Sequence, residues 1–328
     1  MTELKFINDV NSNYKDELTS CRDGFGETLV ELAKDNQDIV ALSADLTEST
    51  RVEDFAKKFP ERFIEVGVAE QNMAGIAAGL AISGKIPFIT SYAVFSPGRN
   101  WDQIRVSICY SKSNVKIIGA HAGISVGADG ATHQGLEDMA ITRVLPNLVV
   151  LCPADKIETQ KAVIEAVKHH GPVYIRFGRE KTSQLTVNSS PFKIGKGFEI
   201  LHGTDVTIIA CGAMLARSLN AIEKLNGSLS VGLINMPSIK PIDKELIIDV
   251  AKNTGAIVTA EEHQITGGLG SAVAEVLSES VPTPIIRVGM LDRFGESGEP
   301  NLLMDHYGMG VDDIIAAVKR AHKLKNAS

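Results

Sequence analysis

The sequence lacks the features that mark secreted, membrane or nucleic-acid-binding proteins. Its four cysteines (Cys21, Cys109, Cys152 and Cys211) form no C-x-x-C pair, which argues against a disulfide framework or a zinc site. No apolar run approaches the roughly 18 residues that a membrane helix needs, and the first residues, MTELKFINDV, do not resemble a secretion signal. Acidic residues (40) outnumber basic residues (33), so neither nucleic acid nor a membrane surface is an expected partner. We therefore expect an unprocessed protein of the cytoplasm.

The chain does have a composition suited to two folded domains. Hydrophobic residues make up 44% and charged residues 22% of the chain, which argues against disorder. Its 328 residues exceed the size of one ordinary core. From residue 16 to residue 179, helix-like segments alternate with continuous apolar runs, a pattern typical of a parallel sheet covered on both faces. A second such series follows, and the strands that we predict are residues 38–45, 62–68, 85–92, 114–121, 147–155, 172–179, 205–213, 230–236, 255–263 and 283–290.

A polar stretch separates the two series. Residues 180–197, EKTSQLTVNSSPFKIGKG, show no periodicity and contain a Ser-Ser-Pro break, which indicates a linker. We predict an α/β protein with two successive three-layer domains on parallel or mixed sheets. The domains are residues 1–185 and 197–328, and residues 186–196 join them.

The densest cluster of polar residues lies in the segment GAHAGISVGADGATHQ. It places His121, Asp129 and His133 in a glycine-rich loop directly after a predicted strand. Open α/β sheets bind their ligands at the carboxyl ends of strands. Two imidazoles and a carboxylate can transfer protons and bind hydroxyl groups. The spacing alone is equally compatible with a solvated surface loop.

Several other residues are candidates with simpler explanations. Glu70 opens an Ala- and Gly-rich helix, where it would complement the helix dipole, and the small residues suggest a subunit or domain contact. Aromatic residues are only 5% of the chain, so Tyr92 and Phe95 in one loop could stack on a flat heterocycle, although core filling would also explain them.

In the second series, GGLGSA lacks the lysine of a phosphate loop and predicts a packing turn, with His263 at the domain interface. Three residues near loop ends could bind phosphate or be solvated: Arg22, Ser49 and Arg179.

Taken in order, these segments resemble one family. The chain is similar to the C-terminal half of transketolase, which comprises a pyrimidine-binding domain and a C-terminal domain. The resemblance covers nearly the whole sequence and rests on SCRDGFGETLVEL, SADLTEST, VGVAEQNM, SYAVFSPGR, GAHAGISVGADGATHQ, PVYIRFGRE, TAEEHQITGGLGSA and DRFGESG. It implies transfer of a two-carbon ketol unit between a ketose phosphate and an aldose or aldose phosphate, with thiamine diphosphate as the cofactor.

The resemblance also implies which residues contact the cofactor. Glu70 would hydrogen-bond the aminopyrimidine ring and favour the tautomer that removes a proton from the thiazolium carbon. Tyr92 and Phe95 would stack on the pyrimidine. Asp45 would lie close to the cofactor and to a subunit contact.

A second group of residues would bind the substrate. The resemblance implies that His121 and Asp129 bind hydroxyl groups of the donor sugar. His133 would sit near the reacting carbonyl and assist proton transfer. The phosphate of a sugar phosphate would be held by Arg22, Ser49 and Arg179.

One family motif is missing. The diphosphate and Mg²⁺ are held in this family by a separate domain with a GDG motif, and the sequence contains no GDG. The resemblance therefore implies the second subunit of a split transketolase, which is inactive without an N-terminal subunit that carries the diphosphate-binding and Mg²⁺-binding domain. We expect an α2β2 assembly with cofactors at the chain interfaces.

Other enzymes of the superfamily remain alternatives. A 1-deoxyxylulose-5-phosphate synthase shares VGADGxTHQG but has an aspartate at the position of His121, so His121 favours ketol transfer. The β subunit of a 2-oxo-acid dehydrogenase decarboxylase and a non-catalytic regulatory subunit are further alternatives. Pentose phosphates are the default substrates, and an unusual pentose or a sulfosugar would require only small changes in the pocket.

Overall fold

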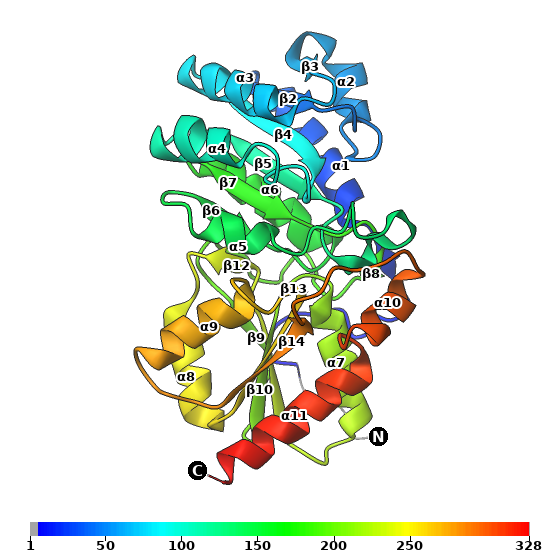
Figure 1. Ribbon diagram of the computed structural model, residues 1–328, viewed down its shortest axis with the longest axis vertical. Helices are drawn as coiled ribbons and strands as arrows, with labels where there is room; N and C mark the ends of the chain where they lie inside the picture. The colour runs from blue at the N-terminus through cyan, green and yellow to red at the C-terminus, as the bar shows by residue number, and fades with distance from the viewer. Residues whose placement is uncertain (1–5, 328) are drawn as a thin grey trace.

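Two β-sheets lie one above the other in the computed structural model, which describes residues 6–327 (Figure 1). The ends of the predicted domains, residues 1–5 and 328, lie outside it. The larger sheet orders its strands β12 (Ser238–Lys240), β6 (Val149–Leu151), β7 (Val173–Arg176), β5 (Lys116–Ala120), β4 (Ile86–Tyr92), β2 (Ile39–Ser43) and β3 (Phe63–Glu65). The smaller sheet orders its strands β14 (Ile285–Met290), β13 (Ile257–Gln264), β10 (Val206–Ala210), β11 (Val231–Asn235) and β9 (Phe198–Leu201). Neighbouring strands are parallel except β12 beside β6 and β9 beside β11.

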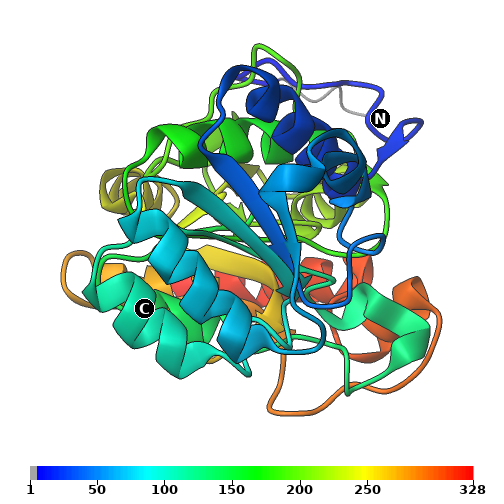
Figure 2. The same ribbon diagram turned by 90° about the horizontal axis from the view of Figure 1, so that it is seen from above.

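Helices cover both faces of each sheet (Figures 1 and 2). In the larger sheet, α1 (Cys21–Asp35) and α6 (Lys156–Lys168) pack on one face, and α3 (Glu70–Ile82) and the π-helix η2 (Ile104–Tyr110) pack on the other. In the smaller sheet, α8 (Lys244–Thr254) and α9 (Leu269–Ser278) pack on one face, and α7 (Met214–Leu225) and α11 (Val311–Lys325) pack on the other. The predicted α/β class with two three-layer units is therefore confirmed.

The remaining elements are short. An antiparallel pair joins β1 (Leu18–Thr19) and β8 (Thr182–Ser183). The other short helices are α2 (Glu53–Lys58), η1 (Pro60–Arg62), α4 (Trp101–Gln103), η3 (Ile124–Asp129), α5 (Asp138–Arg143) and α10 (Pro300–His306). No helix within residues 6–327 is both long and apolar enough to cross a membrane.

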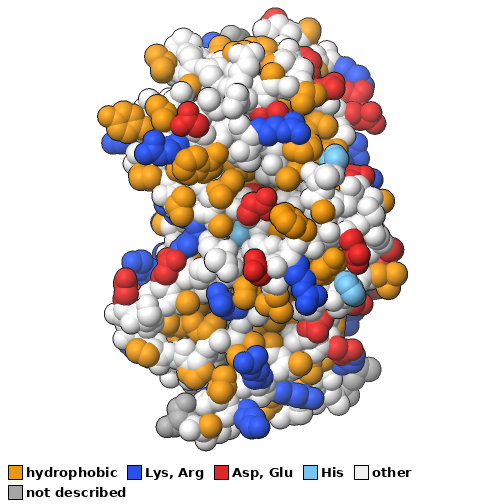
Figure 3. Space-filling view, in the orientation of Figure 1, with side chains coloured by type: hydrophobic (Ala, Val, Ile, Leu, Met, Phe, Trp, Pro, Cys, Tyr) orange, Lys and Arg blue, Asp and Glu red, His pale blue; other side chains and the backbone are white. Residues whose placement is uncertain are grey.

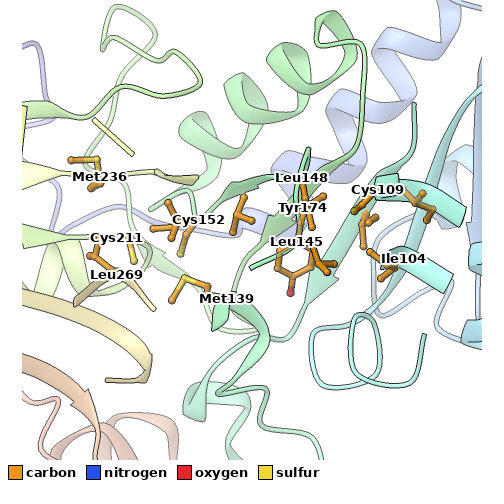
Figure 4. Packing of buried hydrophobic residues seen from close by; sticks show 14 of the residues in the cluster. Ile104, Cys109, Met139, Leu145, Leu148, Cys152, Tyr174, Cys211, Met236 and Leu269 are labelled. Carbon is orange, nitrogen blue, oxygen red and sulfur yellow. The ribbon is translucent and has the colours of Figure 1, made fainter. Parts of the chain in front are cut away.

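One buried apolar cluster runs across the junction between the two halves. Leu145 and Tyr174 of the first half belong to the same cluster as Met236 and Leu269 of the second half (Figure 4). Burial at about 25 cal/mol per Å² makes such a shared core a stabilising contact. The two halves therefore share part of one hydrophobic core.

Two chain segments also cross between the halves. Strand β12 belongs to the second half by sequence but pairs with β6 of the larger sheet. At the N-terminus, Phe6 forms a bridge with Leu201 of the smaller sheet, and the buried Tyr14 donates to Asn220 on α7 (2.8 Å). The predicted linker at residues 186–196 stays a prediction, because β12 and the N-terminal segment each pair with the half of the chain on the other side of it.

His263 lies at the junction, as the sequence predicts. Its ring is fully buried; Nδ1 donates to the Gln264 carbonyl (2.7 Å), and Nε2 accepts from the backbone N–H of Ala140 in the first half (3.4 Å). These two partners require a neutral imidazole with its proton on Nδ1. Burial lowers the pKa of His263 to about 4.

We expect His263 to lower the free energy of unfolding as the pH falls from 6.5 to about 4. In this window the unfolded chain protonates His263 while the folded chain keeps it neutral, so protons favour the unfolded state by up to about 3 kcal/mol. His263→Asn, whose amide can still donate to the Gln264 carbonyl, should lack this part of the pH dependence. Denaturant unfolding of both proteins across the window measures the difference. Glu261, whose pKa burial raises to about 7, lies 3.8 Å from the His263 ring, so both proteins are compared in a Glu261→Gln background that removes its titration. A wild-type-minus-variant difference that does not change with pH would contradict the prediction.

Candidate functional site

The residues predicted from the sequence meet at one edge of the larger sheet. Because β2, β4, β5 and β7 are parallel, their carboxyl ends lie at the same edge. The segment after β2 carries Asp45 and Ser49, β4 ends at Tyr92, and β5 and β7 are followed by His121 and Arg179. The sheet topology therefore brings together residues that are far apart in the sequence.

Four rings form a compact cluster at this edge, contributed by the β4 and β5 ends and the loops that follow them. The His121 ring stacks on Tyr92 with ring centroids 3.9 Å apart and an interplanar angle of 24°. Tyr92 and Phe95 also stack, at 5.7 Å and 17°. His133 meets Phe95 edge-on at 5.3 Å and 71°. The predicted aromatic pair and the two predicted histidines thus form one surface.

His121 occupies a strained and buried position in this cluster. Its φ of 53° lies in the left-handed region that few residues other than glycine adopt, and its side chain is 2% exposed. Burial, and then repulsion by Arg22, Arg179 and Arg51, lowers the pKa of His121 to about 3, so the imidazole is neutral near pH 7. Within residues 6–327, Nδ1 has no hydrogen-bond partner. A buried polar atom of this kind is costly unless a ligand hydroxyl or another polar group satisfies it.

A group of arginines lies beside the rings. The Arg22 guanidinium donates to the Ser49 carbonyl (3.1 Å), and its buried Nε has no partner within the described chain. Burial and repulsion by Arg51 lower the pKa of Arg22. Arg51 Nε in turn donates to Asp23 (2.8 Å). Adjacent guanidinium groups with an unsatisfied donor form an environment that favours a bound anion such as phosphate.

Arg179 connects this group to the loop at residues 121–135. Its guanidinium donates to the Val126 carbonyl (3.0 Å) and lies 3.5 Å from the Asp129 carboxylate. Asp129 and Arg179 are both partly exposed, so the pair contributes at most about 1 kcal/mol to stability. The pair does place the Asp129 carboxylate next to the cationic group.

Glu70 is connected to Phe95 through Arg99. It is the first residue of α3 and is 3% exposed, a burial that complementing a helix dipole does not require. Its carboxylate accepts a hydrogen bond from Arg99 (2.9 Å), and the Arg99 guanidinium lies 4.0 Å from the centre of the Phe95 ring. A flat group that carries N–H donors thus lies on Phe95 and donates to Glu70.

The structure does not bring Asp45 into the ring cluster. Asp45 is exposed, with a φ of 60°, and its backbone N–H donates to Glu65 (2.7 Å). Glu65 also accepts from the Gly67 N–H (2.9 Å) and the Thr47 hydroxyl (2.8 Å), so it fixes the turn that precedes Glu70. A cofactor contact for Asp45 stays a prediction.

Two residues of the site are not among those predicted from the sequence. Arg51 comes directly after the SADLTEST segment, and Arg99 follows Phe95 by four residues in SYAVFSPGR. The spacing of Phe95 and Arg99, one helical turn, is a signal that a stacked pair could form. No comparable local signal identifies Arg51, because its approach to Arg22 depends on the fold.

Similarity to known proteins extends over almost the whole chain. The family described as "Transketolase, pyrimidine binding domain" matches residues 18–184, and "Transketolase, C-terminal domain" matches residues 195–314. A Methanocaldococcus jannaschii protein named as a transketolase C-terminal section is 46% identical over 307 residues, which are 92% of this chain and 96% of that protein. A 6-deoxy-6-sulfo-D-fructose transketolase subunit from Clostridium sp. MSTE9 is 40% identical over 306 residues, 93% of this chain and 95% of that protein.

A solved structure is also similar. A split-gene transketolase, described as an inactive β4 tetramer, shares 49% sequence identity and superposes with a TM-score of 0.88. The match covers 94% of this chain and 99% of that chain. The similarity thus extends over both halves and the junction between them.

Proposed function

Because the chain belongs to the transketolase family, we propose that it is the subunit of a split transketolase that supplies the pyrimidine half of a thiamine-diphosphate site. The observation that carries this proposal is the buried Glu70 carboxylate, which the Arg99 guanidinium connects to Phe95 of the Tyr92–Phe95 surface. The proposed reaction transfers a two-carbon ketol unit from a ketose phosphate to an aldose or aldose phosphate.

The residues at this edge fit an aminopyrimidine ring. Tyr92 and Phe95 offer aromatic faces, and Glu70 offers a buried carboxylate that Arg99 connects to Phe95. The Arg99 guanidinium already combines the two contacts that such a ring would make, since it lies on Phe95 and donates to Glu70. In the proposed site Glu70 holds a proton at a ring nitrogen, and Phe95 and Tyr92 orient the ring. When bound, thiamine diphosphate supplies the electron sink for cleaving and forming the carbon–carbon bond.

The residues around the ring cluster would bind the sugar. His121, which is neutral near pH 7, can exchange hydrogen bonds with a hydroxyl group through its unpartnered Nδ1. The exposed Asp129 carboxylate would accept from hydroxyl groups of the donor sugar. His133 is half-buried, and its Nδ1 lies 2.9 Å from the Thr132 hydroxyl, so Nε2 would transfer a proton at the reacting carbonyl.

We propose that a partner subunit holds the diphosphate and Mg²⁺. Residues 6–327 contain no group of three His, Cys, Asp or Glu side chains arranged to hold a metal ion. The related split-gene transketolase without activity is a tetramer of β subunits, which supports a requirement for a second kind of chain. The proposed holoenzyme is an α2β2 heterotetramer, and the four buried, unpaired cysteines support a reducing, cytoplasmic location.

The surface around α3 and η2 is the proposed contact with neighbouring subunits. On α3, a Cβ added at Gly75 or Gly79 would meet no atom within 4 Å, so another helix could approach closely. Four apolar side chains on or next to α3 and η2 are exposed: Val68, Ile82, Val106 and Tyr110. Figure 3 shows apolar side chains gathered beside α4.

Calorimetry and an activity assay test the proposed function. Thiamine diphosphate and Mg²⁺ are titrated into this chain alone and into its mixture with a transketolase N-terminal subunit that carries the GDG motif. The mixture, but not the chain alone, should bind the cofactor tightly and transfer ketol units. Tight binding by the chain alone would contradict the requirement for a partner, and turnover with pyruvate instead of a ketose phosphate would favour the 1-deoxyxylulose-5-phosphate synthase alternative.

Substitution of Arg22 tests the phosphate site. In the assembled enzyme, Arg22→Met should raise the KM for a phosphorylated acceptor about 10- to 100-fold, because a charge-assisted hydrogen bond contributes about 1.5–3 kcal/mol. The KM for the same acceptor without its phosphate should change little. Arg217→Met is the control, since Arg217 lies on α7 and donates to Asn301. Equal effects on both acceptors would contradict a role in phosphate binding.

A further inference from the structure

The loop at residues 121–135 carries three proposed sugar-binding residues and is held by hydrogen bonds both within it and from outside it. Its base is closed by the Ala122 N–H donating to Phe177 (3.0 Å) and the Gly123 N–H donating to Gly135 (2.8 Å). Between these points the backbone has positive φ at Gly123, Gly127 and Gly130, with values of 89°, 79° and 74°. The helix between these points, η3, is a short 3₁₀ segment interrupted by the non-helical Gly127, so contacts from outside the loop also fix its position.

The second half of the chain provides several of these contacts. The Glu262 carboxylate, from the end of β13, accepts a hydrogen bond from the Ser125 N–H (2.7 Å). Gln134 Nε2 donates both to the Ile124 carbonyl within the loop (3.1 Å) and to the Glu296 carbonyl of the second half (3.0 Å). The turn η3 and α10 also lie side by side in both views (Figures 1 and 2).

The approach of Glu262 to the loop is very close. A Cβ added at Gly123 would lie 2.2 Å from the Glu262 carboxylate, so only glycine fits at this position. Glu262 is 5% exposed, and burial raises the pKa of its carboxyl, while hydrogen bonds from Ser125 oppose this rise. The main chain of Glu262 is held as well, because its carbonyl accepts from the buried Arg176 guanidinium (3.1 Å). The carboxylate is therefore a fixed acceptor, attached to the core of the molecule.

We propose that Glu262 is a positioning residue for the 121–135 loop. By accepting from the Ser125 N–H, its carboxylate sets where His121, Asp129 and His133 stand relative to the Tyr92–Phe95 surface. The C-terminal half then contributes to binding of the donor sugar without touching it. This inference rests on the proposed function for its consequence in catalysis, but the placement of the loop does not depend on substrate.

Amide hydrogen exchange of the assembled enzyme and donor kinetics test the proposal together. In Glu262→Ala, exchange at residues 123–130 should become about tenfold faster or more, because the loop opens more readily. The kcat/KM for the donor should fall about 10- to 100-fold, since small misplacements of binding groups carry costs of this size. Glu262→Gln, whose amide oxygen can still accept from Ser125, should restore most of both properties.

Glu158→Ala is the matched control. Glu158 is another buried glutamate at the junction; it accepts from the Ala154 N–H (2.7 Å) and from Asn235 of the second half (2.7 Å), away from the 121–135 loop. The control should lose stability while exchange in the loop and the donor kcat/KM stay near their wild-type values. If Glu262→Ala does not fold, Glu262→Asp gives the same test, because it keeps the charge and withdraws the acceptor by one methylene group.

The possible results separate the two proposals. Unchanged exchange at residues 123–130 in Glu262→Ala, or in Glu262→Asp where it takes the place of that variant, would overturn the positioning role, and so would equal loop effects in the Glu158 control. If wild-type enzyme transfers no ketol unit, the proposed function fails, and the exchange data still decide whether Glu262 places the loop.

Discussion

Replacing Glu70 with glutamine is expected to reduce kcat of the assembled enzyme by roughly 100- to 10,000-fold, the usual range for removing a general acid or base. Glutamine keeps the shape of the side chain and can still accept the hydrogen bond from Arg99. It cannot hold a proton at a ring nitrogen, which is the role proposed for the buried carboxyl. Steady-state assays with saturating partner subunit, cofactor and both sugars measure the loss.

A control separates this effect from damage to the fold. Glu61→Gln changes an exposed carboxylate beside Arg62 and should leave kcat within about twofold of the wild-type value. Glu70→Gln should keep the melting temperature and the ability to bind the partner subunit. Wild-type activity in Glu70→Gln would exclude the proposed role of Glu70, and it would favour the alternative of a regulatory subunit.

Much of the fold could be predicted because buried parallel strands leave a strong local pattern. Every predicted apolar run contains a strand, from Ile39–Ser43 to Ile285–Met290. Strand β12 (Ser238–Lys240) is not among the predicted strands, because three residues show no periodicity and their pairing with β6 depends on the packing of the halves. The helix-like segment between the predicted strands 85–92 and 114–121 begins at Trp101 but continues as a π-helix over Ile104–Tyr110, because apolar spacing does not specify the hydrogen-bond register.

Local sequence patterns predict the candidate site less well than they predict the strands. Taken singly, Tyr92 and His121 each had a simpler explanation, and they stack because β4 and β5 are parallel neighbours. The family resemblance supplied that long-range information. The resemblance does not identify Arg51, a residue with a backbone φ of 64°. It also does not identify the contact that Glu262 makes from the other half of the chain.

The second large effect is expected from substitution of Arg176, a buried cation at the carboxyl end of β7. Its Nε donates to the Asp138 carboxylate (2.7 Å), which also accepts from the Tyr174 hydroxyl (2.8 Å). Arg176 and Asp138 are 3% and 1% exposed. Arg176→Met should lower the free energy of unfolding by about 3–5 kcal/mol, because it leaves the Asp138 carboxylate buried without its counterion. Denaturant unfolding of the isolated chain measures this loss.

The double variant shows whether the loss comes from the unpaired charge or from packing. In Arg176→Met with Asp138→Leu neither member of this buried pair is charged, so the double variant should be more stable than Arg176→Met alone. Lys85→Met is the surface control: its exposed pair with Asp38 should contribute less than about 1 kcal/mol. Because Arg176 also holds the Glu262 carbonyl, both Arg176 variants should loosen the 121–135 loop, even where the double variant recovers stability. A double variant no more stable than Arg176→Met would mean that Arg176 stabilises the junction mainly through its own packing and its hydrogen bonds to the backbone.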